Sequence, residues 1–256
     1  MSGKVYLVGS GPGGEGLLTR RARVVIDAAD VILYDQLPGE EILASLPARA
    51  EKIDCGKYGG KHMLEQDEIE ALILDRANQG MKVVRLKGGD PFLFGRGGEE
   101  LETVRRAGIP VEMVPGVSSA LAVPASVGIP LTHRKYASQV TILTGNEDPT
   151  KPGPALDWQL LAKSRGTIVI LMGVANLGKI ADVLIKNGKA ADTPVAIIER
   201  GMRKDRRVTI GSLATITGAA RKKGVKPPAV IVIGDVVKLY SPDHRDVIPA
   251  EGGGYD

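Results

Sequence analysis

The chain has 256 residues, of which 43% are hydrophobic, 25% charged and 4% aromatic, and its formal net charge is +4. This hydrophobic content excludes an intrinsically disordered protein, and the length suits one large domain or two smaller ones. The low aromatic content argues against a base-stacking nucleic-acid surface, and no apolar run approaches the roughly 18 residues of a membrane-spanning helix.

The first half of the chain alternates short apolar strands with amphipathic helices. We predict strands over residues 5–8, 31–34, 82–86 and 111–114. Helices are predicted over residues 17–29, 64–78 and 99–107, and Gly80 and Gly108 are stop signals for the last two. Such alternation is typical of a mainly parallel sheet.

The second half has more closely spaced strands, which favours a mixed sheet. Strands are predicted over residues 140–143, 167–171, 194–199, 207–210 and 229–233, and helices over residues 158–163 and 177–186. We place the domain junction in the proline-containing segment that starts at residue 115. This gives an N-terminal domain over residues 1–115, a C-terminal domain over residues 116–241 and a polar tail over residues 242–256.

A glycine-rich stretch, Gly9–Gly14, follows the first strand and matches the G-x-G-x-x-G pattern of dinucleotide-binding units. Asp35 stands at the end of the second strand, where such units place an acidic residue. The pattern therefore admits a nicotinamide-dependent oxidoreductase. Against this interpretation, Pro12 removes an amide N–H from the loop that would hold a pyrophosphate, and no second nucleotide-binding feature follows.

The most informative stretch is residues 88–100, with the sequence GGDPFLFGRGGEE. Gly88 and Gly89 lack a Cβ, so the backbone can approach a ligand closely, and Pro91 fixes the turn that follows. A glycine-rich loop at the carboxyl end of a strand is where open α/β sheets bind small molecules. On composition alone, the alternative is a purely structural turn.

The full stretch resembles the signature loop of the tetrapyrrole methylases, in the form that acts on uroporphyrinogen III. Further motifs of this family occur in the expected order, and the resemblance covers roughly residues 3–240. These motifs are the stretches 9–22, 115–120, 128–134, 171–173, 199–202 and 227–229.

The resemblance implies two α/β domains, with a mainly parallel N-terminal sheet, a mixed C-terminal sheet and an active site in the cleft between them. It implies transfer of methyl groups from S-adenosylmethionine to C-2 and C-7 of uroporphyrinogen III, giving precorrin-2 via precorrin-1 for sirohaem or cobalamin biosynthesis. It implies a homodimer and no metal. A methylase of a later corrin precursor remains an alternative, although such enzymes more often carry a Ser-Gly-Asp-Pro loop.

The resemblance also assigns roles to single residues. Asp35 matches the family's proton acceptor and Lys57 its proton donor. His62 and Arg134 are implied to bind the substrate, whose carboxylates suit the paired donors of a guanidinium. The residues implied to contact S-adenosylmethionine are Pro12, Gly88, Gly89, Asp90, Leu93, Ser118, Ser119, Met172, Gly201 and Ala229.

Most of these residues also have a simpler structural interpretation. Asp35 suits a turn acceptor after a strand, and Lys57 an exposed basic residue. Ser118 and Ser119 suit helix N-caps, and Met172 suits core filling.

The spacing of His62 and Gln66 predicts that their side chains share one face of a helix. A metal site at His62 is disfavoured, because the histidines are far apart in the sequence.

Basic clusters occur at residues 203–207 and 221–223. They are typical of a solvated surface, and attraction to nucleic acid or to a polycarboxylate is the alternative. The low aromatic content makes the nucleic-acid interpretation the weakest. Cys55 is the only cysteine, so an intrachain disulfide is impossible, and with no signal peptide at the start we expect a cytoplasmic protein without membrane partners.

Overall fold

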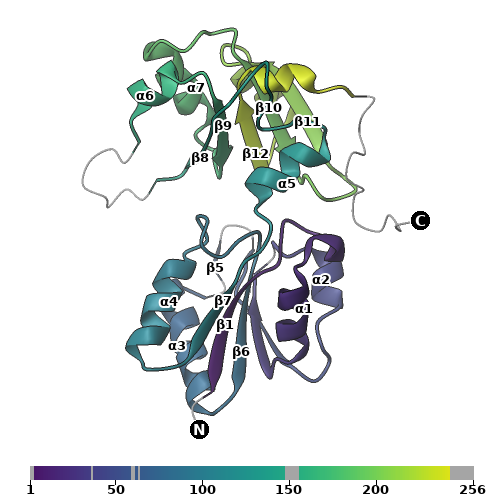
Figure 1. The fold of residues 1–256 in the computed structure, drawn as a ribbon, viewed down its shortest axis with the longest axis vertical. Coiled ribbons are helices and arrows are strands. Elements are labelled where there is room, and N and C mark those ends of the chain that lie inside the picture. Colours follow the sequence, from purple (N-terminus) through teal and green to yellow (C-terminus); the bar gives the residue numbers. More distant parts are fainter. Residues whose placement is uncertain (1–2, 36, 59–60, 63, 148–155, 243–256) are drawn as a thin grey trace. The chain divides into compact units, whose positions relative to one another are not determined.

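The computed structural model describes residues 3–35, 37–58, 61–62, 64–147 and 156–242. The chain divides into two compact units, of which the first ends at Ser119 and the second begins at Ala120. Each unit is an α/β domain built around its own sheet, as the sequence predicted (Figure 1).

The first sheet has the strand order β3-β2-β6-β1-β7, and its strand pairs are all parallel. The carboxyl ends of these strands therefore lie along one edge, which is where sheets of this kind bind small molecules. The strands are β1 (Lys4–Gly9), β2 (Val31–Tyr34), β3 (Glu51–Asp54), β6 (Lys82–Lys87) and β7 (Val111–Val114).

Helices cover both faces of this sheet (Figure 1). On one face α1 (Arg20–Asp27) and α2 (Glu40–Ala44) pack on strand residues that include Val84. On the other face α3 (Gln66–Asn78) and α4 (Gly97–Arg106) pack on residues that include Val83. Because successive strand residues point to opposite faces, most positions of the inner strands β1, β2 and β6 are buried, which explains their apolar runs in the sequence.

Helix starts follow local capping rather than apolar periodicity. The Thr19 Oγ1 accepts a hydrogen bond from the Ala22 N–H at 3.1 Å, so α1 begins at Arg20, later than predicted. Residues Glu15–Leu17 form the short 3-10 helix η1 instead. Glu65 and Glu68 form a capping box at the start of α3.

The second sheet is mixed, as the strand spacing predicted. Its order is β11-β10-β12-β9-β8, with β8 and β9 parallel and the other pairs antiparallel. The strands are β8 (Val140–Thr144), β9 (Thr167–Leu171), β10 (Pro194–Glu199), β11 (Arg207–Ser212) and β12 (Ala229–Ile233).

One face of the second sheet carries α6 (Trp158–Lys163), α7 (Leu177–Lys186) and α8 (Ile216–Lys223), which enclose an aliphatic core. The unit opens with α5 (Ser119–Ser126), and the 3-10 helix η2 (Asp235–Leu239) follows its last strand. In the part of the chain that the structure describes, no helix has the length and apolar character that crossing a membrane requires.

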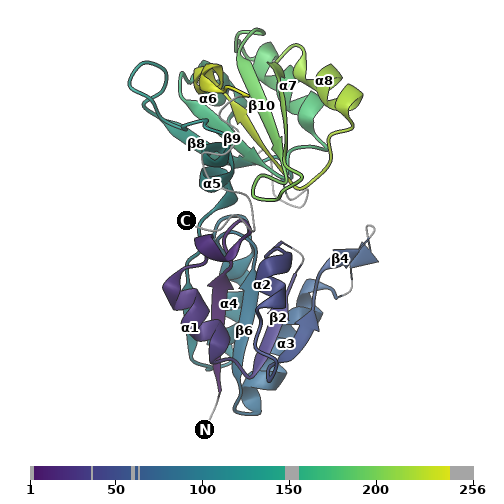
Figure 2. The same cartoon turned by 90° about the vertical axis from the view of Figure 1, so that its right-hand side faces the viewer.

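Some short elements were not predicted from the sequence. They include α2, α8, the charged edge strand β3 and a hairpin of β4 (Lys57–Tyr58) with β5 (Lys61–His62). Figure 2 shows β4 projecting from the body of the first unit. Such short elements carry too few apolar residues for a periodic pattern to reveal them.

Candidate functional site

The loops that follow β1 and β6 are joined at the carboxyl edge of the first sheet. The Gly11 N–H donates to the Gly89 carbonyl at 3.1 Å, and the Gly89 N–H donates to the Gly11 carbonyl at 2.6 Å. This pairing holds half-buried Pro12 beside the signature loop of residues 88–100.

The loop after β7 packs equally closely on these two. A Cβ added to Gly9 would lie 2.5 Å from the Gly116 nitrogen, and one added to Gly116 would lie 2.2 Å from the Gly89 oxygen. A Cβ on Gly89 would face Ser119 N at 3.7 Å and Ser118 Cα at 4.0 Å. Only glycine permits this approach, and it places both serines directly beside the signature loop.

The Asp90 carboxylate ties the signature loop together. Its Oδ1 accepts from the Phe92 N–H at 2.9 Å and its Oδ2 from the Gly116 N–H at 3.2 Å. A carboxylate offers about four acceptor sites, so capacity for a ligand remains. Leu93 is half-buried, between Phe92 and Phe94, which expose 48% and 40% of their surface.

Asp35 directly follows β2, and its carboxylate is held through both oxygens. The Oδ1 accepts from the Leu37 N–H at 2.9 Å, which is the turn-acceptor role considered above. The Oδ2 lies 3.9 Å from Arg85 Nη2. A Cβ on Gly88 would lie 2.2 Å from Leu37 Cβ, so the turn containing Asp35 packs against the signature loop.

A buried group of charged residues lies at the end of β6, on the face covered by α3 and α4. Glu100 is fully buried, and its Oε1 accepts from Arg85 Nε at 3.2 Å, Lys87 Nζ at 3.0 Å and Gln66 Nε2 at 3.3 Å. Its Oε2 has no hydrogen-bond partner among the described residues. Burial, and then the positive charge of Arg85, lower the pKa of Lys87.

Lys57 and His62 lie in the β4–β5 hairpin by their backbones, whereas their side chains lie outside the described part of the structure. Tyr34 pairs with Asp54 at the parallel ends of β2 and β3, so the chain enters this hairpin next to the turn that holds Asp35. The predicted helical face shared by His62 and Gln66 is wrong. His62 lies on a strand, and the helix begins only at Gln66.

In the second unit, three predicted ligand contacts lie at one edge of the sheet. Met172 follows β9 and Gly201 follows β10, while Ala229 begins β12, which runs antiparallel to both. Ala229 pairs with Glu199. The Met172 residue is 50% exposed and has a φ of 57°, so Met172 does not fill the core.

Gly201 is buried where α5 meets this edge. An added Cβ would lie 2.4 Å from Val123 Cγ1, and the Ser126 Oγ–H donates to the Gly201 carbonyl at 3.1 Å. A larger residue would therefore push α5 away from the end of β10.

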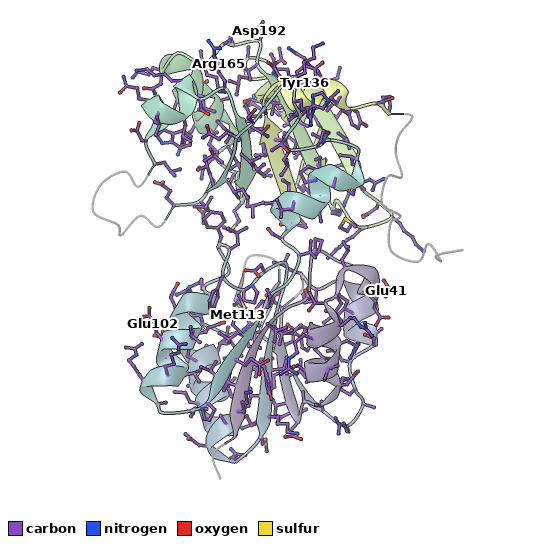
Figure 3. The ribbon with its side chains drawn as sticks, in the orientation of Figure 1. Glu41, Glu102, Met113, Tyr136, Arg165 and Asp192 are labelled. Carbon is purple, nitrogen blue, oxygen red and sulfur yellow. The ribbon has the colours of Figure 1, made fainter. Side chains whose placement is uncertain are left out.

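Arg134 is not brought to this edge. It lies in the turn between His133 and Ala137, before β8, and the neighbouring Leu131 carbonyl accepts from Thr167 Oγ1 at the start of β9. In Figure 3, Tyr136 from the same turn lies at the same end of the second unit as Arg165 and Asp192, which precede β9 and β10. Arg134 thus stands at the amino ends of the strands, opposite Met172.

The glycine loop after β1 does not open a helix in the way that a dinucleotide-binding loop does. The helix α1 begins only at Arg20, after η1 and the Thr19 cap, so its N-terminus is separated from the Gly9–Gly14 stretch. A pyrophosphate site needs the amides of that first helical turn next to the glycines.

Comparison with known proteins decides the family, because residues 4–217 match the Tetrapyrrole (Corrin/Porphyrin) Methylases. The chain belongs to this family. The glycine loop is therefore that of a methylase and not of a dehydrogenase.

This tetrapyrrole methylase is similar to several characterised relatives. It is 60% identical over 238 residues, 93% of both chains, to the S-adenosyl-L-methionine-dependent uroporphyrinogen III methyltransferase of Methanosarcina barkeri. It is 49% identical to siroheme synthase 2 of Yersinia pestis, but the match covers 93% of this chain and 50% of that protein. The chain therefore spans about half the length of that relative.

Its fold is similar to the crystal structure of uroporphyrin-III C-methyl transferase from Thermus thermophilus complexed with S-adenyl homocysteine. The TM-score is 0.78 at 39% identity, covering 93% of this methylase and 100% of that chain. At this identity and coverage, the likeness extends to both units.

From the sequence we did not predict that Arg85, Lys87 and Glu100 lie at the carboxyl edge of the first sheet. A signal was present, because strand β6 is central in a parallel sheet and such strands are almost entirely apolar. Charged residues at alternate positions of that strand indicate a buried partner, which Glu100 supplies.

Proposed function

We propose that the chain transfers two methyl groups from S-adenosylmethionine to uroporphyrinogen III, first at C-2 and then at C-7, giving precorrin-2 by way of precorrin-1. The observation that carries this proposal is the 60% identity, over 93% of both chains, to an S-adenosyl-L-methionine-dependent uroporphyrinogen III methyltransferase. The arrangement of the loops around Gly89 and Asp35 supports it.

The residues of the first unit fit the donor. Gly89 has a φ of +66°, and an added side chain would project into the space beside Ser118 and Ser119. The Asp90 carboxylate adds acceptor capacity for the hydroxyl or ammonium groups of S-adenosylmethionine. We infer that Pro12, Gly88 and Leu93 complete this side of the donor site.

In the second unit we infer that the donor contacts Met172, Gly201 and Ala229. The exposed thioether of Met172 offers a polarizable apolar surface that suits an adenosyl group. The strand ends beside it also offer backbone N–H and carbonyl groups to a ligand.

The reaction needs alignment and one proton acceptor per transfer. A pyrrole carbon attacks the methyl carbon, the sulfur–methyl bond breaks, and S-adenosylhomocysteine leaves with the bonding electrons. The ring then loses a proton, for which we assign Asp35 as the base, with Lys57 as a proton donor. Holding two reactants in line can account for about 7–11 kcal/mol of the barrier.

The direct test is anaerobic incubation of the pure protein with S-adenosylmethionine and uroporphyrinogen III. We expect a product heavier by two CH₂ units, since each transfer adds a methyl group and removes one proton, and two equivalents of S-adenosylhomocysteine, measured by mass spectrometry. The absence of both methylated product and S-adenosylhomocysteine would contradict the proposal. A later corrin precursor, assayed in parallel, identifies the substrate if uroporphyrinogen III is left unmethylated.

A binding measurement needs no tetrapyrrole. S-adenosylhomocysteine at about 100 times its Kd should stabilise the folded protein by about 2.7 kcal/mol and raise its melting temperature. NAD should leave the melting temperature unchanged, and stabilisation by NAD alone would contradict the donor assignment.

We also infer a cytoplasmic homodimer without nucleic-acid or membrane partners. Sedimentation of the purified chain, with and without S-adenosylhomocysteine, measures the oligomeric state. A monomer at micromolar concentration would contradict the dimer.

A further inference from the structure

We propose that Arg85 is a positioning residue for the proton acceptor: it orients the Asp35 carboxylate and is itself held in place by Glu100. This inference rests on the proposed function, because Arg85 acts only through Asp35. No ligand contact is assigned to Arg85.

Arg85 lies in the middle of a buried strand, between the apolar residues Val84 and Leu86. Its side chain is 5% exposed. It lies in central strand β6, and its register partner on β2 is Leu33. A buried guanidinium is costly unless its donors are satisfied, so a residue of this kind indicates a specific set of partners.

Those partners form a fixed fork. The Nε donates to Glu100 Oε1 at 3.2 Å, and Nη1 lies 3.4 Å from the Leu33 carbonyl and 3.3 Å from the Leu86 carbonyl. The remaining nitrogen, Nη2, is the one directed at Asp35, 3.9 Å from its Oδ2. The guanidinium is planar, so fixing Nε and Nη1 also fixes Nη2.

The charges of the group require a further anion. Arg85 and Lys87 are both buried, and the one fully buried carboxylate beside them is Glu100. Among the described residues, Asp35 is the next carboxylate in contact with Arg85. The half-buried Asp35 therefore balances the excess positive charge of a buried group, and this attraction defines its orientation.

Asp35 is thus restrained from two sides. The Leu37 N–H holds Oδ1 at 2.9 Å, and Arg85 lies on the side of Oδ2. The carboxylate cannot turn freely about its Cβ–Cγ bond, so its basic lone pairs keep one direction. Misplacing a catalytic group by about 1 Å can lower the rate about 100-fold, so restraint of the Asp35 carboxylate by buried Arg85 should have a large effect on turnover.

The test is a double-mutant cycle between Arg85 and Asp35. Arg85→Lys keeps the positive charge beside Glu100 but replaces the fork by a single nitrogen. We expect kcat to fall by about 10-fold or more. The KM for S-adenosylmethionine should stay close to the wild-type value, whereas the melting temperature should fall, because the Leu33 and Leu86 carbonyls lose the Arg85 donor.

The decisive comparison is made in the Asp35→Asn background. If Arg85 works through the carboxylate, Arg85→Lys should change the residual turnover of Asp35→Asn by less than about twofold, because coupled residues are not additive. An equal fall in both backgrounds would show a merely structural role and overturn the proposal. Turnover of the slow variants is followed by mass spectrometry over long incubations.

Two further proteins make the outcome interpretable. Arg76→Met is the matched control, since Arg76 lies in the same unit and pairs with Glu51 on the surface; its kcat should equal that of the wild type. Arg85→Gln retains an amide donor for Glu100 and repeats the cycle if Arg85→Lys does not fold.

Failure of this proposal is distinct from failure of the proposed function. A wild-type protein that methylates, together with an additive cycle, overturns only the role of Arg85. Wild-type protein that transfers no methyl group overturns both, before any variant is made.

Discussion

The two sheet edges that hold the predicted ligand contacts differ in their chemistry. Beneath the edge of the first sheet lie the charged side chains of Asp35, Arg85, Lys87 and Glu100. The edge of the second sheet presents Met172 and backbone at Gly201, and its charged side chains form ion pairs such as that of Arg200 with Asp205. The first edge is suited to moving a proton, and the second to recognising the shape of a ligand.

The buried glutamate of each unit shows the same contrast. Glu100 is paired with cations that are 5% and 7% exposed, whereas Glu199 is paired with Arg207, which is 45% exposed. Water can reach Arg207 but hardly reaches Arg85 or Lys87. The first unit thus carries a charge network that is buried on both sides, and the second a buried carboxylate whose cation reaches the solvent.

We expect the largest effect on kcat from a substitution at the edge of the first sheet. Asp35→Asn should lower kcat by about 100- to 10,000-fold, because general-base catalysis contributes about that much. Its affinity for S-adenosylhomocysteine should be unchanged, as measured by calorimetry. Unchanged turnover would remove Asp35 from the mechanism.

The paired glutamates give the next largest effect. Glu100→Ala leaves two buried cations without their carboxylate and should lower the free energy of unfolding of the first unit by about 3–5 kcal/mol. Glu199→Ala removes the acceptor for the Lys226 N–H and for Arg207, and should cost about 1–3 kcal/mol. Urea unfolding of both variants makes the comparison, and equal losses would contradict the contrast drawn between the units.

Met172→Ala tests whether the edge of the second sheet contacts the ligand. Burying a half-exposed methionine against a ligand is worth about 1 kcal/mol, so S-adenosylhomocysteine should bind about fivefold more weakly. Leu160→Ala, an exposed apolar residue on α6, is the matched control and should leave the affinity unchanged. Equal affinities in the wild type, Met172→Ala and Leu160→Ala would place the ligand away from Met172.

The smallest effect is a change in pH dependence. Burial lowers the pKa of Lys87 in the folded state below its ordinary value of 10.5, so the unfolded chain binds this proton more tightly. The Lys87 contribution to stability should therefore increase as pH rises from that lowered pKa towards 10.5. Melting curves in this range should show a shallower pH slope for Lys87→Met than for the wild type, and equal slopes would contradict the burial of a charged Lys87.

Much of the fold could be predicted because its strands are buried on both faces. The strands at residues 31–34, 111–114, 167–171 and 229–233 match the prediction at both ends. Helix starts were less predictable, since Thr19 and not the apolar pattern sets the beginning of α1. The hairpin at Lys57–His62 has no apolar pattern at all, and for this reason its spacing from Gln66 wrongly suggested a helical face for His62.

The candidate site was predictable only where loops have distinctive residues. Glycines at positions 9, 89 and 116 signal close backbone approach, and the structure shows that they contact one another. The partnership of Arg85 with Asp35 depends on strand order, because β2 and β6 are far apart in sequence and adjacent in the sheet. Arg134 was assigned from its motif alone, whereas its place at the amino ends of the strands depends on topology.

The donor site is best tested by a crystal structure of the chain with S-adenosylhomocysteine. We expect the ligand to contact the loop from Gly88 to Leu93 together with Ser118, Met172 and Gly201. Density for the ligand at another place, with the loop from Gly88 to Leu93 untouched, would contradict this expectation.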